Sequence, residues 1–586
     1  MLKWNFTLTI LQITAPNRYA LKLSFVVFKL YTFYLGNTVS NTAAILFEPD
    51  AYLLSEPKLM GRQAAGNSFL RAAVAGRGEE AMYAYTPSQK SASIFKQVVA
   101  SIDSTASAQW VPADRLDLLE QIGALYLPGP GLDVAAKLRL RAGNQAYSLV
   151  GVTHTTASHR AMDAITGLLT APVMPWDALI CTSTAVLETV KILLNAEIEA
   201  LRWRFGSSIQ ITLPQLPVIP LGVHCSDFDF TVDERLLARK SLNITKDEIV
   251  LVFVGRLSFH AKAHPHAMYL AAQEVALKTG KKITLLQCGW FGNDAIKASF
   301  IEGAAQFCPD VRALFVDGRE PELARHSWAG ADIFLSLSDN IQETFGITPI
   351  EAMAAGLPVI VSDWNGYKDT VRDGVDGFRI PTWMPPPALG EQFAKGHEAG
   401  TLSYDIYCGL SCQTISVSMD SLIERLTLLV ENATLRQTMG QAGKEHAQTQ
   451  FDWRIVYQQY QSLYNYLHKL RKSTSPKQKA TFQVAPNRLD PFLSFGHYPS
   501  TLIQPSTRVT VLNHNVLNQY RCLIKNPLFN YATQILPKVE LVEKIDLVLQ
   551  VQTVTLDELS AQTQTNLGEI VLAVAVLAKM NLVQLG

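Results

Sequence analysis

Short apolar runs alternate with amphipathic helical patterns along most of the chain from Ala43 onward. A first series of buried strands is predicted at 43–48, 123–128, 147–154, 178–183 and 217–222. A second series is predicted at 249–256, 282–289, 312–318, 331–338 and 357–363. Strands that alternate with helices in this way indicate parallel βαβ units, so the predicted fold class is α/β.

The polar segment 227–248 separates the two series and is predicted to be an interdomain linker with a short helix. The chain then divides into an N-terminal Rossmann-like domain, 43–235, and a C-terminal Rossmann-like domain, 236–472. Pro and Gly residues mark an insertion at 384–417 within the second domain. Two doubly wound domains joined by a linker face a ligand cleft at the carboxyl ends of their strands.

The two ends of the chain depart from this pattern. Residues 473–514 are predicted to be a linker, because Ser, Pro, Lys and Gln are frequent in their first part. A small, mainly helical tail module, 515–586, resembles a helix-turn-helix or winged-helix fragment. Its second helix has one cation, Lys579, among many Ala, Val and Leu residues, which favours protein contact over DNA binding.

The N-terminal extension, residues 1–42, carries four basic residues and no acidic residue. Lys22 and Lys29 interrupt its apolar stretch, which argues against a spanning helix. Two interpretations stay open. One is a segment that binds at a membrane interface, and the other is a disordered addition from an upstream start codon.

Composition narrows the class of protein. The chain has 51 Lys+Arg and 51 Asp+Glu residues, whereas a general nucleic-acid binder is normally basic, so no nucleic-acid partner is expected. A hydrophobic content of 48% excludes a disordered chain. Seven scattered cysteines do not form a disulfide framework, which favours a reducing, cytoplasmic location, with peripheral membrane contact through the extension left open.

The most informative segment is ADIFLSLSDNIQETFGITPIEAMAAGLPVIVSD, residues 331–363. A helix is predicted to begin near Gly346 and to end before Gly356, so Glu343 precedes it and Glu351 lies on it. The N–H groups of Phe345, Gly346, Ile347 and Thr348 then lie at the helix N-terminus, where an anion is favoured. Carboxylates on either side of such a phosphate are suited to binding the hydroxyls of a sugar and a ribose.

The segment VFVGRLSFHAKAHP, residues 252–265, follows another predicted strand. It places Arg256 and Lys262 after the strand, and no paired acidic residue is expected near them. Two cations at the carboxyl end of a strand are suited to a diphosphate, and they can stabilise the negative charge of a departing phosphate.

These segments resemble family-4 glycosyltransferases, the glycosyl transferases of group 1, which have the GT-B fold. The resemblance rests on GRLSFHAK (255–262), ETFGITPIEAMAAGLPVIVSD (343–363), NGYKDTVRDGVDGFRI (365–380) and PLGVHCSDF (220–228). It covers roughly 43–472 and is strongest in 249–380.

The resemblance implies a role for each matching residue. Arg256 and Lys262 are expected to hold the donor diphosphate. Glu343 is expected to bind the donor sugar hydroxyls and Glu351 the ribose hydroxyls. The backbone of 345–348 is expected to bind the distal phosphate.

The N-terminal domain matches the family at fewer positions. The resemblance places His154 at the reaction centre, after a predicted strand, and places Gly61 and Gly66 in a glycine loop that approaches the diphosphate. Two departures concern the donor preference: the spacing from Arg256 to Lys262 is one residue longer than usual, and Asp369 stands where the family often has Glu.

The implied activity is an enzymatic, metal-independent transfer of a sugar from a nucleotide-diphosphate sugar to an acceptor hydroxyl, with retention of anomeric configuration and no cofactor. The acceptor would be a saccharide or a lipid-linked saccharide, as in polysaccharide or glycolipid biosynthesis. Two alternatives stay open: a sugar-nucleotide epimerase of the same fold, and a non-catalytic scaffold that uses the tail for protein contact.

Overall fold

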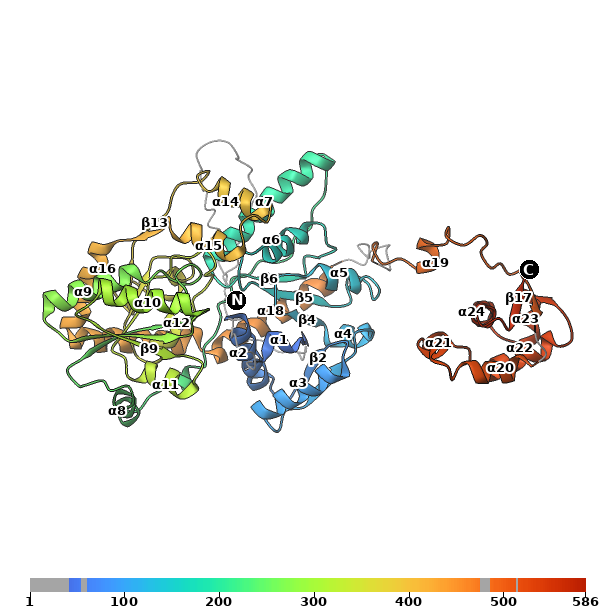
Figure 1. Ribbon diagram of the computed structural model, residues 1–586, viewed down its shortest axis with the longest axis horizontal. Coiled ribbons are helices and arrows are strands. Elements are labelled where there is room, and N and C mark those ends of the chain that lie inside the picture. Colours follow the sequence, from blue (N-terminus) through green and yellow to red (C-terminus); the bar gives the residue numbers. More distant parts are fainter. Residues whose placement is uncertain (1–41, 54–60, 475–484, 513–514) are drawn as a thin grey trace, which may run out of the picture. The chain divides into compact units, whose positions relative to one another are not determined.

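The computed structural model in Figure 1 describes residues 42–53, 61–474, 485–512 and 515–586. The chain forms two compact units, Met1–Ala485 and Pro486–Gly586, each with its own core. The first unit contains both predicted Rossmann-like domains, and the second contains the tail module.

The N-terminal domain is built on a six-stranded parallel sheet of order β3-β2-β1-β4-β5-β6. Its strands are β1 (Ala44–Leu46), β2 (Met82–Tyr85), β3 (Ala108–Val111), β4 (Ala124–Leu127), β5 (Ser148–Val152) and β6 (Ala178–Ile180). Its helices are α1 (Pro49–Tyr52), α2 (Gly61–Gly76), α3 (Gln89–Ile102), α4 (Leu116–Ile122), α5 (Asp133–Arg139), α6 (His159–Thr166) and α7 (Thr184–Phe205).

Two differences from the predicted strands stand out in this sheet. Strands β2 and β3 were not predicted. Strand β3 is half exposed and contains a Gln, so it forms no continuous apolar run, whereas β2 is a mostly buried run of Met, Tyr and Ala that was overlooked. The predicted strand at 217–222 is wrong. That segment makes only an isolated bridge from Val218 to Cys181 at the sheet edge.

The C-terminal domain repeats the same topology, with the order β12-β11-β10-β7-β8-β9 and parallel pairing throughout. Its strands are β7 (Ile249–Val254), β8 (Ile283–Gly289), β9 (Arg312–Asp317), β10 (Ile333–Ser336), β11 (Val359–Ser362) and β12 (Gly377–Ile380). Its helices are α8 (Val232–Ser241), α9 (His266–Thr279), α10 (Asp294–Phe307), α11 (Pro321–Ala329), α12 (Thr348–Ala354), α13 (Tyr367–Thr370), α16 (Met419–Glu431) and α17 (Ala433–His446). The predicted pair of doubly wound domains of the GT-B type is confirmed.

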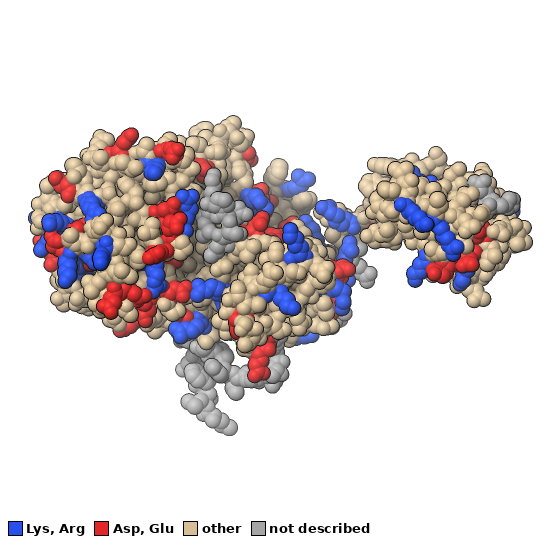
Figure 2. Space-filling view, turned by 60° about the horizontal axis from the view of Figure 1, so that its bottom comes forward, with Lys and Arg blue, Asp and Glu red and all other residues tan. Residues whose placement is uncertain are grey.

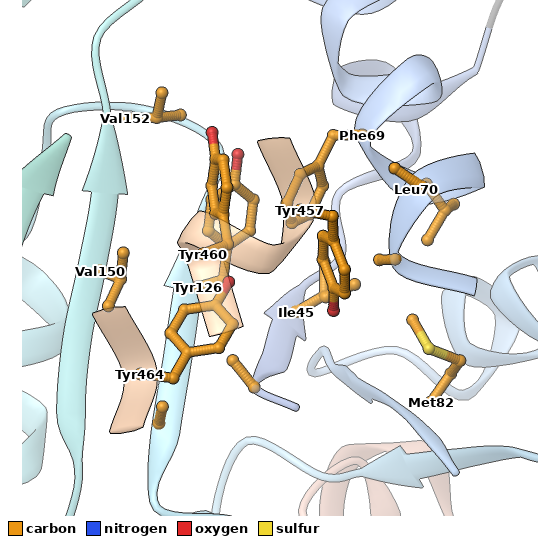
Figure 3. Close-up of a cluster of buried hydrophobic side chains, with 14 of the residues drawn as sticks. Ile45, Phe69, Leu70, Met82, Tyr126, Val150, Val152, Tyr457, Tyr460 and Tyr464 are labelled. Atoms are coloured by element: carbon orange, nitrogen blue, oxygen red, sulfur yellow. The ribbon is translucent and has the colours of Figure 1, made fainter. Parts of the chain in front are cut away.

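Helix α18 (Trp453–Ser473) ends the range predicted for the C-terminal domain, yet its buried face packs on the first sheet. Tyr457, Tyr460 and Tyr464 of this helix lie in one buried cluster with Phe69 of α2 and Tyr126 of β4 (Figure 3). The rings of Phe69 and Tyr126 stack with their centroids 4.2 Å apart. This helix therefore ties the end of the second domain to the core of the first.

The predicted insertion, 384–417, is not only a loop. It contains helices α14 (Glu391–Glu398) and α15 (Tyr404–Cys412). Strand β14 (Ser416–Val417) closes it by antiparallel pairing with β13 (Thr382–Trp383). Figure 1 shows α14 and α15 beside α6 and α7 of the N-terminal domain.

The second unit contains a three-stranded antiparallel sheet, β16-β15-β17, packed with helices. Its elements are α19 (Pro491–Ser494), β15 (Arg508–Val511), α20 (Val516–Leu523), α21 (Pro527–Asn530), α22 (Val539–Leu549), β16 (Val554–Thr555), α23 (Leu556–Thr563), α24 (Leu567–Lys579) and β17 (Val583–Leu585). The capping box of Thr555 and Glu558 starts α23, and the turn before α24 completes a helix-turn-helix. Because β15 pairs with β16 and β17, the module includes residues from 508 onward rather than from 515.

The surface charge and the hydropathy of the helices are the features that would indicate a nucleic-acid or membrane partner. Basic and acidic side chains are interspersed on the face drawn in Figure 2. Among the described residues, no helix is both long and apolar enough to cross a membrane. The N-terminal extension lies outside the described residues except for its last residue, Thr42, so both interpretations of it stay predictions.

Candidate active site between the two domains

The strand order of the second sheet predicts where a ligand would bind in the C-terminal domain. The chain runs from β7 outward to β9 and then returns to β10 on the other side of β7. Ligands of open parallel sheets bind at such a switch point, beyond the carboxyl ends of the strands. The segment after β7 carries Arg256 and Lys262, and the segment after β10 carries Glu343. The two most informative sequence segments therefore meet at the switch point between β7 and β10.

Lys262 and Glu343 form an ion pair there, between Lys Nζ and Glu Oε2. The side chains are 23% and 11% exposed, so water screens the pair only weakly. This corrects the expectation from the sequence that Lys262 has no acidic residue nearby. The two residues are 81 positions apart in the chain, and only the pairing of β7 with β10 brings them together.

The pair sets the protonation of both groups. Burial alone would raise the pKa of Glu343, but the charge of Lys262 and hydrogen bonds from Lys262 and the Thr344 and Phe345 N–H groups lower it below its usual value. Burial would also lower the pKa of Lys262, yet Glu343 outweighs that cost and raises it. Both groups are therefore charged at neutral pH.

The turn after Glu343 requires glycine. Gly346 has a φ of 76°, and a Cβ at this position would lie 1.9 Å from the ring of Tyr367. The hydroxyl of Tyr367 lies 3.0 Å from Ser336 Oγ on β10, which fixes the ring. Residues 345–348 thereby enter α12 at a defined angle, with Ile347 as N-cap residue. The predicted helix start near Gly346 is confirmed to within two residues.

Glu351 lies on α12, one turn into the helix, and differs from Glu343 in its surroundings. Burial raises its pKa to about 7, and the charge of Lys262 only partly offsets this. Asp339, in the loop after β10, behaves similarly: burial raises its pKa to about 7 despite hydrogen bonds from Cys412 and the His264 N–H. Asp339 was not singled out in the sequence, because an Asp in a loop gives no signal of burial.

Arg256 is half buried beside the pair. Its guanidinium Nη2 donates to the carbonyl oxygen of Ala261 at 3.0 Å and to Gln342 Oε1 at 3.4 Å. Both acceptors are neutral, so these hydrogen bonds leave the charge of Arg256 uncompensated. Arg256 and Lys262 are thus held at the carboxyl end of β7 as predicted, the first by neutral groups and the second by a carboxylate.

The N-terminal domain meets this site through Thr344. Its hydroxyl donates to the carbonyl oxygen of His154 at 2.7 Å, and its own carbonyl oxygen accepts from Ser183 Oγ at 2.7 Å. Asp369 also crosses between the domains, where it accepts from the N–H and hydroxyl of Thr184 at the start of α7, at 2.6 and 2.7 Å. The loop that carries His154 therefore lies next to Glu343, as the prediction for His154 requires.

Gly61 and Gly66, which were predicted to lie in a loop near the diphosphate, are both residues of α2. Gly61 is the first residue of α2, and the residues just before it lie outside the described part of the chain. Gly66 lies within α2 rather than in a loop, so its predicted loop placement is wrong. A Cβ on Gly66 would lie 2.1 Å from the carbonyl oxygen of Ala51 in α1. Close packing of α1 on α2 accounts for that glycine without a ligand.

Comparison with known proteins relates one segment of the C-terminal domain to a family. Residues 234–395 match the family model described as glycosyl transferases group 1. This segment contains Arg256, Lys262, Glu343 and Glu351. The resemblance found in the sequence is thereby confirmed.

Curated relatives match over part of their length. A D-inositol 3-phosphate glycosyltransferase of Nocardia farcinica is 28% identical over 168 residues, which cover 28% of this chain and 36% of that protein. The enzyme of the same name from Geodermatophilus obscurus is 30% identical over 205 residues, which cover 33% and 43%. The chain thus spans less than half the length of these relatives.

A solved structure resembles a larger part of the chain. The crystal structure of HepE from Anabaena in complex with UDP-glucose aligns with a TM-score of 0.46 and 15% identity. The alignment covers 72% of this chain and 100% of that protein.

Proposed function

We propose, starting from the match of residues 234–395 to glycosyl transferases group 1, that the protein transfers a sugar from a nucleoside-diphosphate sugar to an acceptor hydroxyl with retention of configuration. The observation that carries the proposal is the buried pair of Lys262 and Glu343 beside Arg256. One ordered carboxylate and two cations at a strand switch point are suited to a neutral sugar joined to an anionic diphosphate.

In this proposal the diphosphate binds to Arg256, Lys262 and the amides of residues 345–348. Arg256 has neutral partners, so it can turn to a phosphate without breaking an ion pair. Lys262 has three N–H donors and can bind a phosphate while it stays bonded to Glu343. The amides at the start of α12 lie next to Glu343, where the helix dipole adds to the positive potential.

The two carboxyl groups bind hydroxyls. Glu343 is ionised and has two oxygens, so one can hold Lys262 while the other accepts from a hydroxyl of the donor sugar. Glu351 has a pKa of about 7 and accepts from the ribose hydroxyls when it is ionised. The lysine therefore connects the diphosphate directly to the carboxylate that orients the sugar.

Transfer breaks the bond between the anomeric carbon and the phosphate oxygen and forms a bond from the anomeric carbon to the acceptor oxygen. Arg256 and Lys262 stabilise the negative charge that develops on the leaving diphosphate. The acceptor attacks from the face that the diphosphate leaves, and its hydroxyl proton passes to the departing phosphate oxygen. In this proposal His154, in the loop whose carbonyl accepts from the Thr344 hydroxyl, serves the acceptor side of this centre.

The proposed transferase activity is tested by measuring sugar-nucleotide binding and the release of the nucleoside diphosphate. UDP-, GDP- and ADP-sugars are first screened by thermal shift, since a ligand that binds only the folded state raises apparent stability. Release of the nucleoside diphosphate is then followed with and without saccharide and glycolipid acceptors. We expect release to depend on an acceptor. Conversion of the donor to an isomer without acceptor would instead indicate an epimerase, and no binding of any sugar nucleotide would overturn the proposal.

Glu343→Gln is the matched variant for this assay. It keeps the size of the side chain and a hydrogen-bond acceptor for Lys262 but removes the charge. We expect transfer to fall about 100-fold, which corresponds to roughly 2.7 kcal/mol of transition-state stabilisation. Lys278→Ala is the control and should transfer at the wild-type rate. Lys278 lies in the last turn of α9, near the amino ends of the strands and so away from the candidate site.

A further inference from the structure

The insertion between β12 and α16 contacts the N-terminal domain directly. His159 Nε2 lies 2.7 Å from the carbonyl oxygen of His397 on α14, and the two imidazole rings are 3.8 Å apart between centroids. The ring of Tyr407 on α15 stacks on His397 at 4.2 Å, with 2° between the ring planes. The His397 residue is only 5% exposed although it belongs to an insertion. Three rings in contact, of which His397 and Tyr407 are stacked and His159 is tilted by 41°, thus join the insertion to α6.

A second contact reaches the loop that carries His154. The hydroxyl of Tyr404, the first residue of α15, lies 3.4 Å from the hydroxyl of Thr155. Thr155 is the neighbour of His154 in the chain. The charge of Arg256 also acts on Tyr404, so this tyrosine lies close to the cation of the proposed donor site. Tyr404 therefore stands between the two domains at the candidate site.

The other end of α15 is fixed to the C-terminal domain. The thiol of Cys412 lies 3.4 Å from the carbonyl oxygen of Phe259 and within hydrogen-bond reach of the side chain of Asp339, and its one S–H can donate to either. Gly409 packs against His260, whose Cβ would lie 3.2 Å from a Cβ at the glycine. Phe259 and His260 belong to the loop between Arg256 and Lys262. The insertion is thus anchored on the loop that carries both cations.

We propose that α14 and α15 form an interdomain clasp that positions the His154 loop over the donor site, with Tyr404 and His397 as the positioning residues. This inference rests on the proposed function, because it assigns the clasp to the acceptor side of that same site. The clasp joins the cation loop to residues 155–159, while Thr344 holds the carbonyl of His154 from the other side. Neither Tyr404 nor His397 is needed to bind the nucleotide.

Loss of the clasp should therefore leave nucleotide binding intact and loosen the N-terminal side. We would compare Tyr404→Phe, His397→Ala and His397→Phe with Ile406→Ala, a control on α15 whose side chain is 53% exposed. Hydrogen exchange would be followed in residues 153–166 and 391–412. Calorimetry with UDP and release of UDP from UDP-glucose, with and without acceptor, would be measured in parallel.

The expected result is specific to the clasp. In His397→Ala, exchange in 153–166 becomes at least 10-fold faster, whereas His397→Phe keeps the ring stack and restores most of the protection. In Tyr404→Phe, kcat for transfer falls at least 5-fold, while KM for the donor and the Kd for UDP stay within 3-fold of wild type. Ile406→Ala changes none of these quantities.

Two results would overturn the proposal. One is that exchange in 153–166 is the same in His397→Ala as in Ile406→Ala. The other is that Tyr404→Phe transfers at the wild-type rate. Failure of the proposed function gives a different result: wild type and all variants bind neither UDP nor UDP-glucose, while the effect of His397→Ala on exchange is still seen.

Discussion

The two sides of the candidate site, one on each domain, are held in place in different ways. On the C-terminal side, Lys262, Glu343 and Arg256 take their partners from their own domain. On the N-terminal side, the carbonyl of His154 and the side chain of His159 take theirs from the other domain, at Thr344 and His397. The proposed donor side is therefore built by one domain, and the proposed acceptor side is completed only when the domains meet.

This difference explains why a single domain can carry the family resemblance. The segment that matches the family model, 234–395, contains the cations and both carboxylates with the partners that orient them. It stops within α14, so α15 and its contact to Thr155 lie outside it. We expect donor binding to depend on the matched segment alone and acceptor use to depend on the cross-domain contacts.

The largest effect is expected from breaking the ion pair of the donor side. Lys262→Ala leaves Glu343 charged and largely buried without its partner, which should destabilise the protein by about 3 kcal/mol. The double variant Lys262→Ala/Glu343→Ala removes both charges and should recover part of this loss. Urea unfolding of the single and double variants measures the coupling. Additive losses would show that the two side chains do not support each other.

A smaller effect, visible only as a pH dependence, is expected at Glu351. Its folded-state pKa of about 7 lies above its ordinary value of 4.5, so the native state holds the proton more tightly than the unfolded chain. Stability from this group is complete below pH 4.5 and is lost as the pH rises through 7. At roughly 1.4 kcal/mol per pKa unit, the loss by pH 8 is at most about 3.5 kcal/mol.

Glu351→Gln removes that titration. The variant should equal wild type in stability near pH 5 and exceed it at pH 8, as measured by urea unfolding at both values. Asp339 is unchanged in both proteins, so its own titration cancels in the difference. If the two stabilities ran parallel between pH 5 and pH 8, Glu351 would not have the raised pKa.

The smallest effect is expected on the N-terminal side. Thr344→Val removes the hydrogen bond from the Thr344 hydroxyl to the carbonyl of His154 and keeps the shape of the side chain. We expect a loss of about 1 kcal/mol in the free energy of unfolding, the usual worth of one neutral hydrogen bond. UDP affinity should stay within 2-fold of wild type while transfer slows. A large loss of UDP affinity would mean that the two sides are not independent.

The sequence predicted the donor side better than the acceptor side for physical reasons. Strands β7 and β10 are continuous apolar runs, and Glu343 and Glu351 are placed by one helix start, so local pattern was enough. The pairing of Lys262 with Glu343 was missed, because it depends on strand order rather than on spacing. Strand β3 was missed because it is half exposed and only partly apolar, whereas the apolar run of β2 was overlooked.

The clasp could not be predicted for a similar reason. Pro and Gly mark its first part as a loop, and nothing in the pattern shows that His397 becomes buried against His159. The raised pKa values of Asp339 and Glu351 likewise come from burial, which a single sequence does not display. Contacts across domains carry no local periodicity, so they emerge only from the folded chain.

The central claim is that the C-terminal side of the candidate site, with Arg256, Lys262 and Glu343, is preformed to bind a nucleoside diphosphate. Isothermal titration of UDP into wild type, Arg256→Ala and Lys278→Ala tests it most directly. We predict binding to wild type and Lys278→Ala with equal affinity, and binding to Arg256→Ala that is about 10- to 100-fold weaker, as the loss of a charge-assisted hydrogen bond of roughly 1.5–3 kcal/mol requires. Equal affinity of all three proteins would contradict the account.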